Sequence, residues 1–317
     1  MKIQIISGLT AFALTVIVGF LIIPLLKKLK AGQPILKYVT EHKEKGGTPT
    51  MGGLFFVLPS IVVFLIFNGV KQKSLNLSIV ITLSYMIIGF LDDFLKIKFK
   101  KNEGLKPYQK IIFQLSVAII AGVYVYLNGL YGYRLPYTKK IVSLGLFSVP
   151  LTIIIFLAIT NSVNLTDGLD GLASGTSISY LLILLLLVFL QTGNASNGYI
   201  GLCACFIGGL LGFLVFNTHK ASVFMGDTGS LALGGLIGSV SIFTENSLFI
   251  PIIGIMFVLS SISVIVQVAY FKRTKKRIFL MAPLHHHFQE KGVSESKISF
   301  SYFLITLIIG LTTLAIY

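Results

Sequence analysis

Long apolar runs separated by short polar segments form the dominant pattern along this chain. Runs of about 20 predominantly apolar residues predict membrane-spanning helices, because that length crosses the hydrocarbon core of a bilayer. The pattern therefore predicts an all-α polytopic membrane protein with about ten transmembrane helices, and residues 1–317 as a single integral membrane domain. The predicted spans are 3–26, 51–68, 75–92, 109–127, 141–160, 172–190, 198–217, 229–244, 248–271 and 300–317.

The positions of the basic residues predict how these helices are oriented. The first run lacks the small-residue cleavage site of a signal peptide and is followed by Lys27, Lys28 and Lys30, so we expect an uncleaved helix with its N-terminus outside. Most of the 26 lysines and arginines then lie in loops on the opposite side, which the positive-inside rule makes the cytoplasmic side. These loops are 27–50, 93–108, 161–171, 218–228 and 272–299, and the C-terminus is expected outside.

The composition excludes a soluble domain, because 55% of the residues are hydrophobic and only 12% are charged. A net charge of +15 would suggest nucleic acid as the partner of a soluble protein. Here the cytoplasmic excess of Lys and Arg accounts for the charge, so we expect a lipid bilayer and no nucleic acid as partner. Cys203 and Cys205 are two residues apart, point to different helix faces, and are expected to be packing residues.

The acidic residues show a distribution that insertion rules do not explain. A carboxylate at the centre of a membrane helix costs roughly 2.5 to 3.5 kcal/mol, yet five of the 11 acidic residues lie at the cytoplasmic margins of apolar runs. Carboxylates in this position must line a hydrated cavity or bind a cation. The pattern therefore indicates a membrane enzyme or a transporter, and the five residues are Asp92, Asp93, Asp167, Asp170 and Asp227.

Two of the motifs around these acids precede or end predicted spans. The segment 45–53 reads KGGTPTMGG, in which a threonine can cap the following helix and Lys45 lies beside its free N–H groups, an arrangement suited to a phosphate. Asp92 and Asp93 end the third span, and because adjacent helix positions diverge by about 100°, they are not expected to be equivalent. A capped helix and a hydrated helix end are the structural alternatives for these two motifs.

Three further motifs lie in the later cytoplasmic loops. Asn161, Asn164, Asp167 and Asp170 recur at every third position beside glycines, which favours one polar row and a site. The segment 217–230, NTHKASVFMGDTGS, contains Asp227, which could cap a helix or bind Mg²⁺ together with phosphates. Residues 281–292 read MAPLHHHFQEKG; consecutive histidines do not converge easily on one zinc ion, so His285, His286 and His287 are expected to bind a phosphate or sugar instead.

Taken together and in this order, TPTMGG, LDD, NxxNLTDGLDGLA, VFMGDTGSL and MAPLHHHFQEKG resemble the phospho-N-acetylmuramoyl-pentapeptide transferase family, within the polyprenyl-phosphate N-acetylhexosamine-1-phosphate transferase superfamily. The resemblance covers nearly the whole chain. It implies a ten-helix homodimer in the bacterial inner membrane with a cytoplasmic, Mg²⁺-dependent site. The reaction it implies transfers phospho-MurNAc-pentapeptide from UDP-MurNAc-pentapeptide to undecaprenyl phosphate, giving lipid I and UMP in peptidoglycan biosynthesis.

The same resemblance implies roles for individual residues. Asp227 corresponds to the magnesium ligand, and Asp92 and Asp93 correspond to the catalytic doublet near the lipid phosphate; which lysine from Lys96 to Lys110 meets that phosphate stays open. Residues at the positions of the family's uridine pocket are Lys45, Leu169, Asp170, Asn217 and Phe224. Residues where the family contacts the rest of the nucleotide sugar or its inhibitors are Thr50, Asn164, Asp167, Gln267 and His286.

The sequence is compatible with two other functions and with two mechanisms. A sister transferase would use UDP-N-acetylglucosamine, and an ion-coupled transporter would also carry intramembrane carboxylates, although the acids here lie at one face and no inverted repeat is evident. For the transferase, a lipid phosphate with a second pKa near 6 is mostly dianionic at neutral pH. Direct attack is therefore our hypothesis, against a two-step path through a phosphoryl-aspartate.

Overall fold

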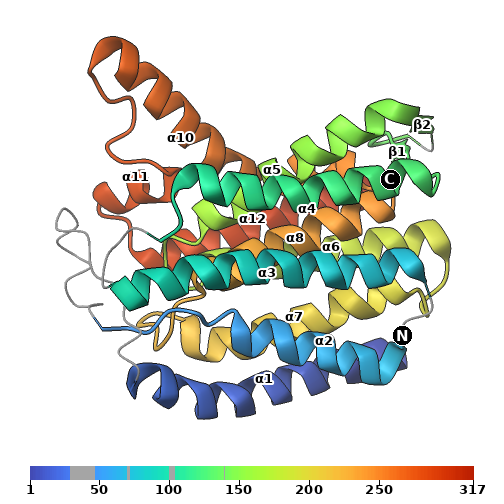
Figure 1. Cartoon of the computed structure of the whole chain (residues 1–317), viewed down its shortest axis with the longest axis horizontal. Coiled ribbons are helices and arrows are strands. Elements are labelled where there is room, and N and C mark those ends of the chain that lie inside the picture. Colours follow the sequence, from blue (N-terminus) through green and yellow to red (C-terminus); the bar gives the residue numbers. More distant parts are fainter. Residues whose placement is uncertain (29–46, 70–71, 100–103, 139) are drawn as a thin grey trace.

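The computed structural model describes residues 1–28, 47–69, 72–99, 104–138 and 140–317. It is a bundle of long helices that run side by side, with one small hairpin (Figure 1). Eight helices in the described part of the chain are long and apolar enough to cross a membrane. The helices are α1 Lys2–Lys28, α2 Leu54–Asn68, α3 Lys73–Phe99, α4 Pro107–Leu127, α5 Ser148–Thr166, α6 Leu172–Thr192, α7 Gly198–Asn217, α8 Gly226–Phe243, α9 Ile250–Ile253, α10 Ile255–Thr274, α11 Leu284–Glu290 and α12 Glu295–Ile316.

Helix α8 forms the centre of the bundle. All of its residues except Asp227 are buried, and α3 and α5 pack along it. On one side α1 and α2 pack against α7, and α6 packs between α7 and α12. Because its neighbours bury α8 on all sides, α8 holds its first residues in a fixed place relative to them.

The backbones of α3 and α8 approach closely at Gly89. A Cβ added at Gly89 would overlap the backbone carbonyl of Asp227, so no larger residue fits between the two helices at this point. Small residues allow this kind of backbone contact between membrane helices. Because Gly89 lies one turn before Asp92 and Asp93, the crossing brings both aspartates to the start of α8.

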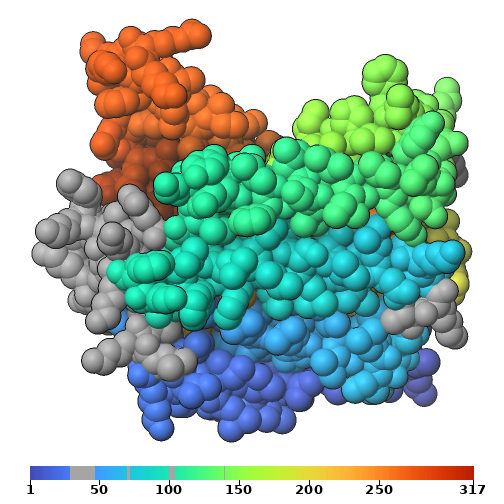
Figure 2. Space-filling view, viewed as in Figure 1, coloured from blue at the N-terminus to red at the C-terminus, as the bar shows by residue number. Residues whose placement is uncertain are grey.

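The two ends of the bundle differ in character. Both chain termini and the hairpin of β1 Gly132–Arg134 and β2 Ile141–Ser143 lie at one end (Figure 1, right). The end of α3, the start of α4 and α11 lie at the other end. Helix α10 leans away from the bundle, and Figure 2 shows it as a projection separated by a hollow from the green surface of α4 and α5. The loops with the polar motifs therefore gather at one end.

The structure confirms an all-α polytopic membrane protein and corrects several predicted boundaries. The span predicted at 141–160 is wrong at its start, because Ile141–Ser143 is strand β2 and α5 extends from Ser148 to Thr166. The span at 248–271 is interrupted at Gly254 and ends at Thr274, and the one at 300–317 begins at Glu295. Helix α2, with 15 residues, is too short to be among these eight helices, and α8, with 18 residues, is less apolar than they are. Strands β1 and β2 pair as an antiparallel hairpin, and both cysteines are free and buried.

Candidate active site

Three carboxylates meet where α3 ends and α8 begins. Carboxylate oxygens of Asp92, Asp93 and Asp227 all lie within 4.8 Å of one another. Asp92 and Asp93 are buried, and Asp227 is the one residue of α8 with an accessible side chain. Three ionised carboxylates this close together repel strongly in a medium of low dielectric constant, so the cluster requires nearby positive charge.

Two lysines supply that charge from different helices. Lys96 Nζ lies 2.6 Å from Asp92 Oδ2, 3.2 Å from Asp227 Oδ2 and 3.9 Å from Asp93 Oδ1. Lys110 Nζ, from the first turn of α4, lies 2.8 Å from the same Asp227 oxygen. Since Lys96 follows Asp92 by four residues, the helix itself places this pair on one face. Of the lysines between 96 and 110 that the structure describes, these two belong to the cluster.

Asp92 and Asp93 have different partners, as their divergence on the helix predicts. Asp92 Oδ1 accepts a hydrogen bond from the backbone N–H of Leu105 at 2.9 Å, which ties the start of the segment before α4 to α3. Asp93 Oδ2 accepts from the backbone N–H of Thr228 at 3.0 Å and from its hydroxyl at 2.7 Å. Asp93 thus caps the N-terminus of α8 from another helix, satisfying an N–H group that has no partner within α8.

Asp227 does not cap its own helix. The first turn of α8 has no side-chain cap from Met225, and the Asp227 carboxylate points to other elements instead. Its Oδ1 accepts a hydrogen bond from Asn164 Nδ2 at 2.8 Å, and the same amide group donates to Ser230 Oγ at 2.9 Å. Asn164 lies in the last turn of α5. Together with Lys96 of α3 and Lys110 of α4, it fixes the Asp227 carboxylate from three neighbouring helices.

Asp167 follows directly after α5 and adds a fourth carboxyl group to this region. Its pKa is raised well above the usual range, first by desolvation and then by the negative charges of Asp227, Asp93 and Asp170. The backbone N–H of Gly226 opposes that rise. Asp167 and Asp227 are therefore close enough to influence each other, and the acidic motifs converge on one end of the bundle.

The residues present suit a hard divalent cation. Mg²⁺ prefers oxygen ligands and commonly takes one or two carboxylates together with substrate phosphates. Asp92, Asp93 and Asp227 offer three such oxygens in reach of one ion. Asp93 Oδ1 is buried and has no hydrogen-bond partner, so the cluster contains acceptor capacity that the described residues leave unused.

The loop before α2 docks on the loop before α8 through backbone hydrogen bonds. The N–H of Phe224 donates to the carbonyl of Pro49, and the N–H of Gly52 donates to the carbonyl of Phe224, at 2.8 and 2.9 Å. Gly226, at φ +71°, lies where a Cβ would overlap Asp93 Oδ2 and Thr50 Oγ1. Thr50 is fully buried beside this glycine. Lys45 lies outside the described residues.

A second polar cluster lies beside the first. Oxygens and nitrogen of Asp170, His219 and Glu295 also lie within 4.8 Å of one another. His219 Nδ1 is 3.8 Å from Asp170 Oδ2 and 3.6 Å from Glu295 Oε2, and the backbone N–H of Asp170 donates to Glu295 Oε1 at 2.8 Å. This cluster joins the turn after α5 to the loop after α7 and to the first turn of α12.

Several residues expected to bind substrate have structural partners in the chain. Asn217 accepts from the backbone N–H of Gly171 and donates to the carbonyl of Val223, so its amide connects two loops. Leu169 packs into a small apolar cluster with Met256 and Tyr302. The polar row is divided in space, because Asn161 donates to Gln114 Oε1 on α4, whereas Asp170 belongs to the second cluster.

The three histidines of α11 point to three different neighbours. His285 is fully buried, neither ring nitrogen has a hydrogen-bond partner, and a Cβ at Gly168 would overlap its Nε2. Burial and then His286 lower the pKa of His285 well below its usual value, so it is neutral. His286 Nδ1 lies 2.9 Å from Gln289 Oε1, and His287 Nδ1 accepts from the backbone N–H of Leu280.

Some residues of the site had no sequence signal strong enough to single them out. Thr228, His219 and Glu295 stand in no pattern of spacing that points to a site. Their partners are distant in sequence, so periodicity does not reveal them. The i,i+4 spacing of Asp92 and Lys96 was the one local signal that could have identified a lysine of the cluster.

Comparison with known proteins shows which family this chain resembles along its length. The model of the family described as "Glycosyl transferase family 4" matches residues 75–245, from α3 to just past the end of α8. Among curated relatives, a phospho-N-acetylmuramoyl-pentapeptide-transferase of Clostridium novyi (strain NT) is 44% identical over 98% of this chain and 96% of its own. One of Clostridioides difficile (strain 630) is 40% identical over 96% of this chain and 94% of its own.

These two relatives are similar to the chain over almost its full length, and the matched family region contains all three carboxylates of the cluster. The chain therefore belongs to the phospho-N-acetylmuramoyl-pentapeptide-transferase family and is a phosphoglycosyl transferase enzyme.

Proposed function

We propose that this enzyme carries out the Mg²⁺-dependent transfer of phospho-MurNAc-pentapeptide from UDP-MurNAc-pentapeptide to undecaprenyl phosphate, with lipid I and UMP as products. The observation that carries the proposal is the cluster of Asp92, Asp93 and Asp227 between two lysines at one end of a membrane bundle. A pyrophosphate and a lipid phosphate are both anionic, so their approach requires compensating positive charge. The names of the relatives supply the substrate class.

Asp227 and its two neighbours of the cluster would hold the cation. When bound, Mg²⁺ supplies charge compensation at the pyrophosphate and holds its oxygens in place. Asn164 and Lys110 fix the orientation of the Asp227 carboxylate, and Thr228 fixes that of Asp93. Preorganised groups of this kind act without rearranging during the reaction.

Direct attack of the lipid phosphate on the donor requires no covalent intermediate on the protein. The lipid phosphate, mostly dianionic at neutral pH, forms a new P–O bond to the β-phosphorus, the bond from that phosphorus to the bridging oxygen breaks, and UMP leaves. Lys96 contacts Asp92 and Asp227. Its ammonium group can therefore form an ion pair with an incoming phosphate oxygen. Asp92 then orients the nucleophile and is needed as a base only for the monoanion.

The remaining assignments follow the family resemblance. The uridine would bind near Phe224 and the turn from Asp167 to Asp170, with Lys45 and Asn217, while Thr50, Gln267 and His286 would contact the rest of the donor. The protein would act in the bacterial inner membrane as a homodimer with about ten spans, with the carboxylate end facing the cytoplasm and both termini outside.

The test is a reconstitution of purified protein with UDP-MurNAc-pentapeptide and undecaprenyl phosphate. We expect UMP release that requires Mg²⁺ and falls at least a hundredfold in Asp227→Asn, which removes one charge from the cluster. Incubation with labelled donor and no lipid acceptor should leave no label on the protein. Covalent label would refute direct attack, and UMP release from UDP-N-acetylglucosamine alone would refute the assigned donor.

A further inference from the structure

The start of α12 holds the backbone of the turn that joins α5 to α6. The backbone N–H of Asp170 donates to Glu295 Oε1 at 2.8 Å, and the hydroxyl of Ser299 donates to the carbonyl of Asp170, also at 2.8 Å. Glu295 and Ser299 are four residues apart, so both lie on one face of α12. One helix face therefore binds both backbone polar groups of a single residue in the turn.

Apolar residues on the same face of α12 fix the preceding residue of the turn. Leu169 is buried in a cluster that includes Ile298 and Tyr302, which follow Glu295 by three and seven residues and so continue its face along the helix. The turn belongs to no helix, and buried backbone groups outside regular structure need partners from elsewhere. Four residues of α12 thus hold Leu169 and Asp170.

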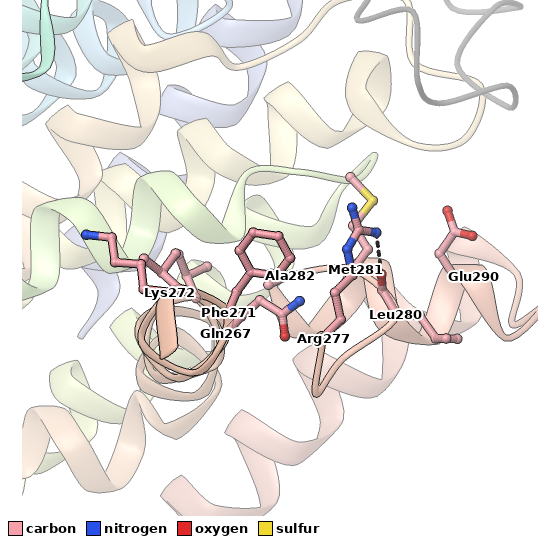
Figure 3. A pocket seen from close by; sticks show the side chains of 10 residues that line it. Gln267, Phe271, Lys272, Arg277, Leu280, Met281, Ala282 and Glu290 are labelled. Carbon is pink, nitrogen blue, oxygen red and sulfur yellow. Dashed lines mark hydrogen bonds between the residues drawn. The ribbon is translucent and has the colours of Figure 1, made fainter. Parts of the chain in front are cut away.

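A second support holds the turn from α11. His285 packs against Gly168, where a Cβ would overlap its Nε2. The loop before α11 is itself anchored, because Arg277 donates to the carbonyl of Leu280 within it and Gln267 of α10 accepts hydrogen bonds from its backbone (Figure 3). Loss of one contact from α12 should therefore shift the turn without unfolding it.

The turn lies beside the carboxylate cluster. Asp167, at its start, is close enough to Asp227 for the two charges to interact. Since one membrane-spanning helix ends here and the next begins, the turn lies beyond the hydrocarbon core, in which a prenyl chain stays. A shift of the turn should therefore affect the water-soluble substrate more than the lipid.

We infer that Glu295 and Ser299 are positioning residues for the nucleotide donor. They act through the backbone of Asp170 and do not touch the substrate. The inference rests on the proposed function, which places the uridine at this turn. The groups that matter are the acceptor oxygen of Glu295 and the hydroxyl of Ser299, and the negative charge of Glu295 is not required.

The experiment measures the kinetics of both substrates in variants of these two residues. Ser299→Ala removes the hydroxyl, and Glu295→Met removes the acceptor oxygen from a side chain of similar length. We expect KM for UDP-MurNAc-pentapeptide and the inhibition constant of UMP to rise about tenfold in both variants, as for the loss of one hydrogen bond. KM for undecaprenyl phosphate and kcat should stay close to the wild-type values.

Two further variants serve as controls. Glu295→Gln removes the charge but keeps an oxygen that can accept from the N–H of Asp170, so its donor KM should equal that of the wild type. Ser301→Ala removes a hydroxyl that donates to the carbonyl of Lys297 in the same helix, and its donor KM should also stay unchanged. Ser299→Ala, the milder of the two test variants, decides the outcome if Glu295→Met does not fold.

The other outcomes have distinct meanings. An unchanged donor KM in Ser299→Ala would overturn the inference, and so would a parallel rise of both KM values or a loss of kcat alone, which indicate general destabilisation. A donor KM raised equally by Glu295→Gln and Glu295→Met would also overturn it, because the charge of Glu295 near His219 would then be what acts. A wild type that releases no UMP from the donor would refute the proposed function instead.

Discussion

At the scale of single residues, the cluster shows how neighbouring carboxylates acquire different tasks. Asp92 contacts Lys96 and the segment before α4, whereas Asp93 closes the N-terminus of α8. Three carboxylates and two lysine ammonium groups leave one negative charge when all are ionised. The divalent cation of the proposed function would reverse that sign and so prepare the site for a substrate phosphate.

Thr228 tests whether the position of Asp93 matters for turnover. Thr228→Val keeps the shape of the side chain and the backbone N–H bond but removes the hydroxyl that donates to Asp93 Oδ2 at 2.7 Å. A hydrogen bond to a buried charged group contributes roughly 1.5 to 3 kcal/mol. We expect kcat for UMP release to fall about tenfold or more, with the protein still folded by thermal unfolding in detergent.

A matched control lies at the other end of the same helix. The hydroxyl of Thr244, the residue that follows α8, donates to the carbonyl of Val240 and accepts from Asn246 Nδ2, so both of its partners lie at the end of α8 away from the cluster. Thr244→Val should therefore change neither kcat nor KM. Equal losses in both variants would show that the effect is general destabilisation of α8 and that Asp93 needs no such support.

At the scale of elements, the site depends on how closely α3 approaches α8. Gly89→Ala places a methyl group against the carbonyl of Asp227, where backbone cannot move aside easily. We expect a separation of the two helices that lowers the thermal midpoint by several degrees and reduces turnover at least tenfold, because the aspartates of α3 move away from Lys110 and Asp227. Overpacking of this kind costs about 1 to 3 kcal/mol.

Gly175→Ala provides the comparison within a helix of the same bundle. A Cβ there meets Phe303 at 3.7 Å, an ordinary contact, and alanine favours a helix over glycine by up to about 1 kcal/mol. Its activity should equal that of the wild type, with an equal or higher midpoint. If Gly89→Ala also behaves in this way, the close crossing is not what assembles the cluster.

The elements also show what a sequence reveals and what it does not. Apolar length predicted most helices, because hydrocarbon thickness acts on each span separately. Apolar length gave the wrong structure at two places where tertiary contacts determine the secondary structure. Residues 141–143 pair with β1, and Gly254 divides α9 from α10. The motifs indicated the carboxylates of the cluster, but Lys110, Thr228 and Glu295 acquire their partners only through helix crossings that no local pattern encodes.

At the scale of the whole molecule, the two ends of the bundle carry different chemistry. One end holds the hairpin, both termini and the ion pair of Arg134 with Glu245, and the other holds every carboxylate of the two clusters. A nucleotide sugar is water-soluble and charged, whereas a prenyl phosphate stays in the bilayer. The proposed reaction therefore requires the carboxylate end at a membrane surface that the nucleotide can reach.

Sidedness can be measured because both native cysteines are free and buried within α7, which gives a low labelling background. Thr138→Cys introduces an exposed thiol at the hairpin end, and Ser296→Cys introduces one beside Glu295 at the carboxylate end. In right-side-out vesicles a membrane-impermeant maleimide should label Thr138→Cys and spare Ser296→Cys, and inside-out vesicles should reverse the result. Labelling of Ser296→Cys from outside would place the site on the wrong surface for a cytoplasmic nucleotide sugar and reject the proposed orientation.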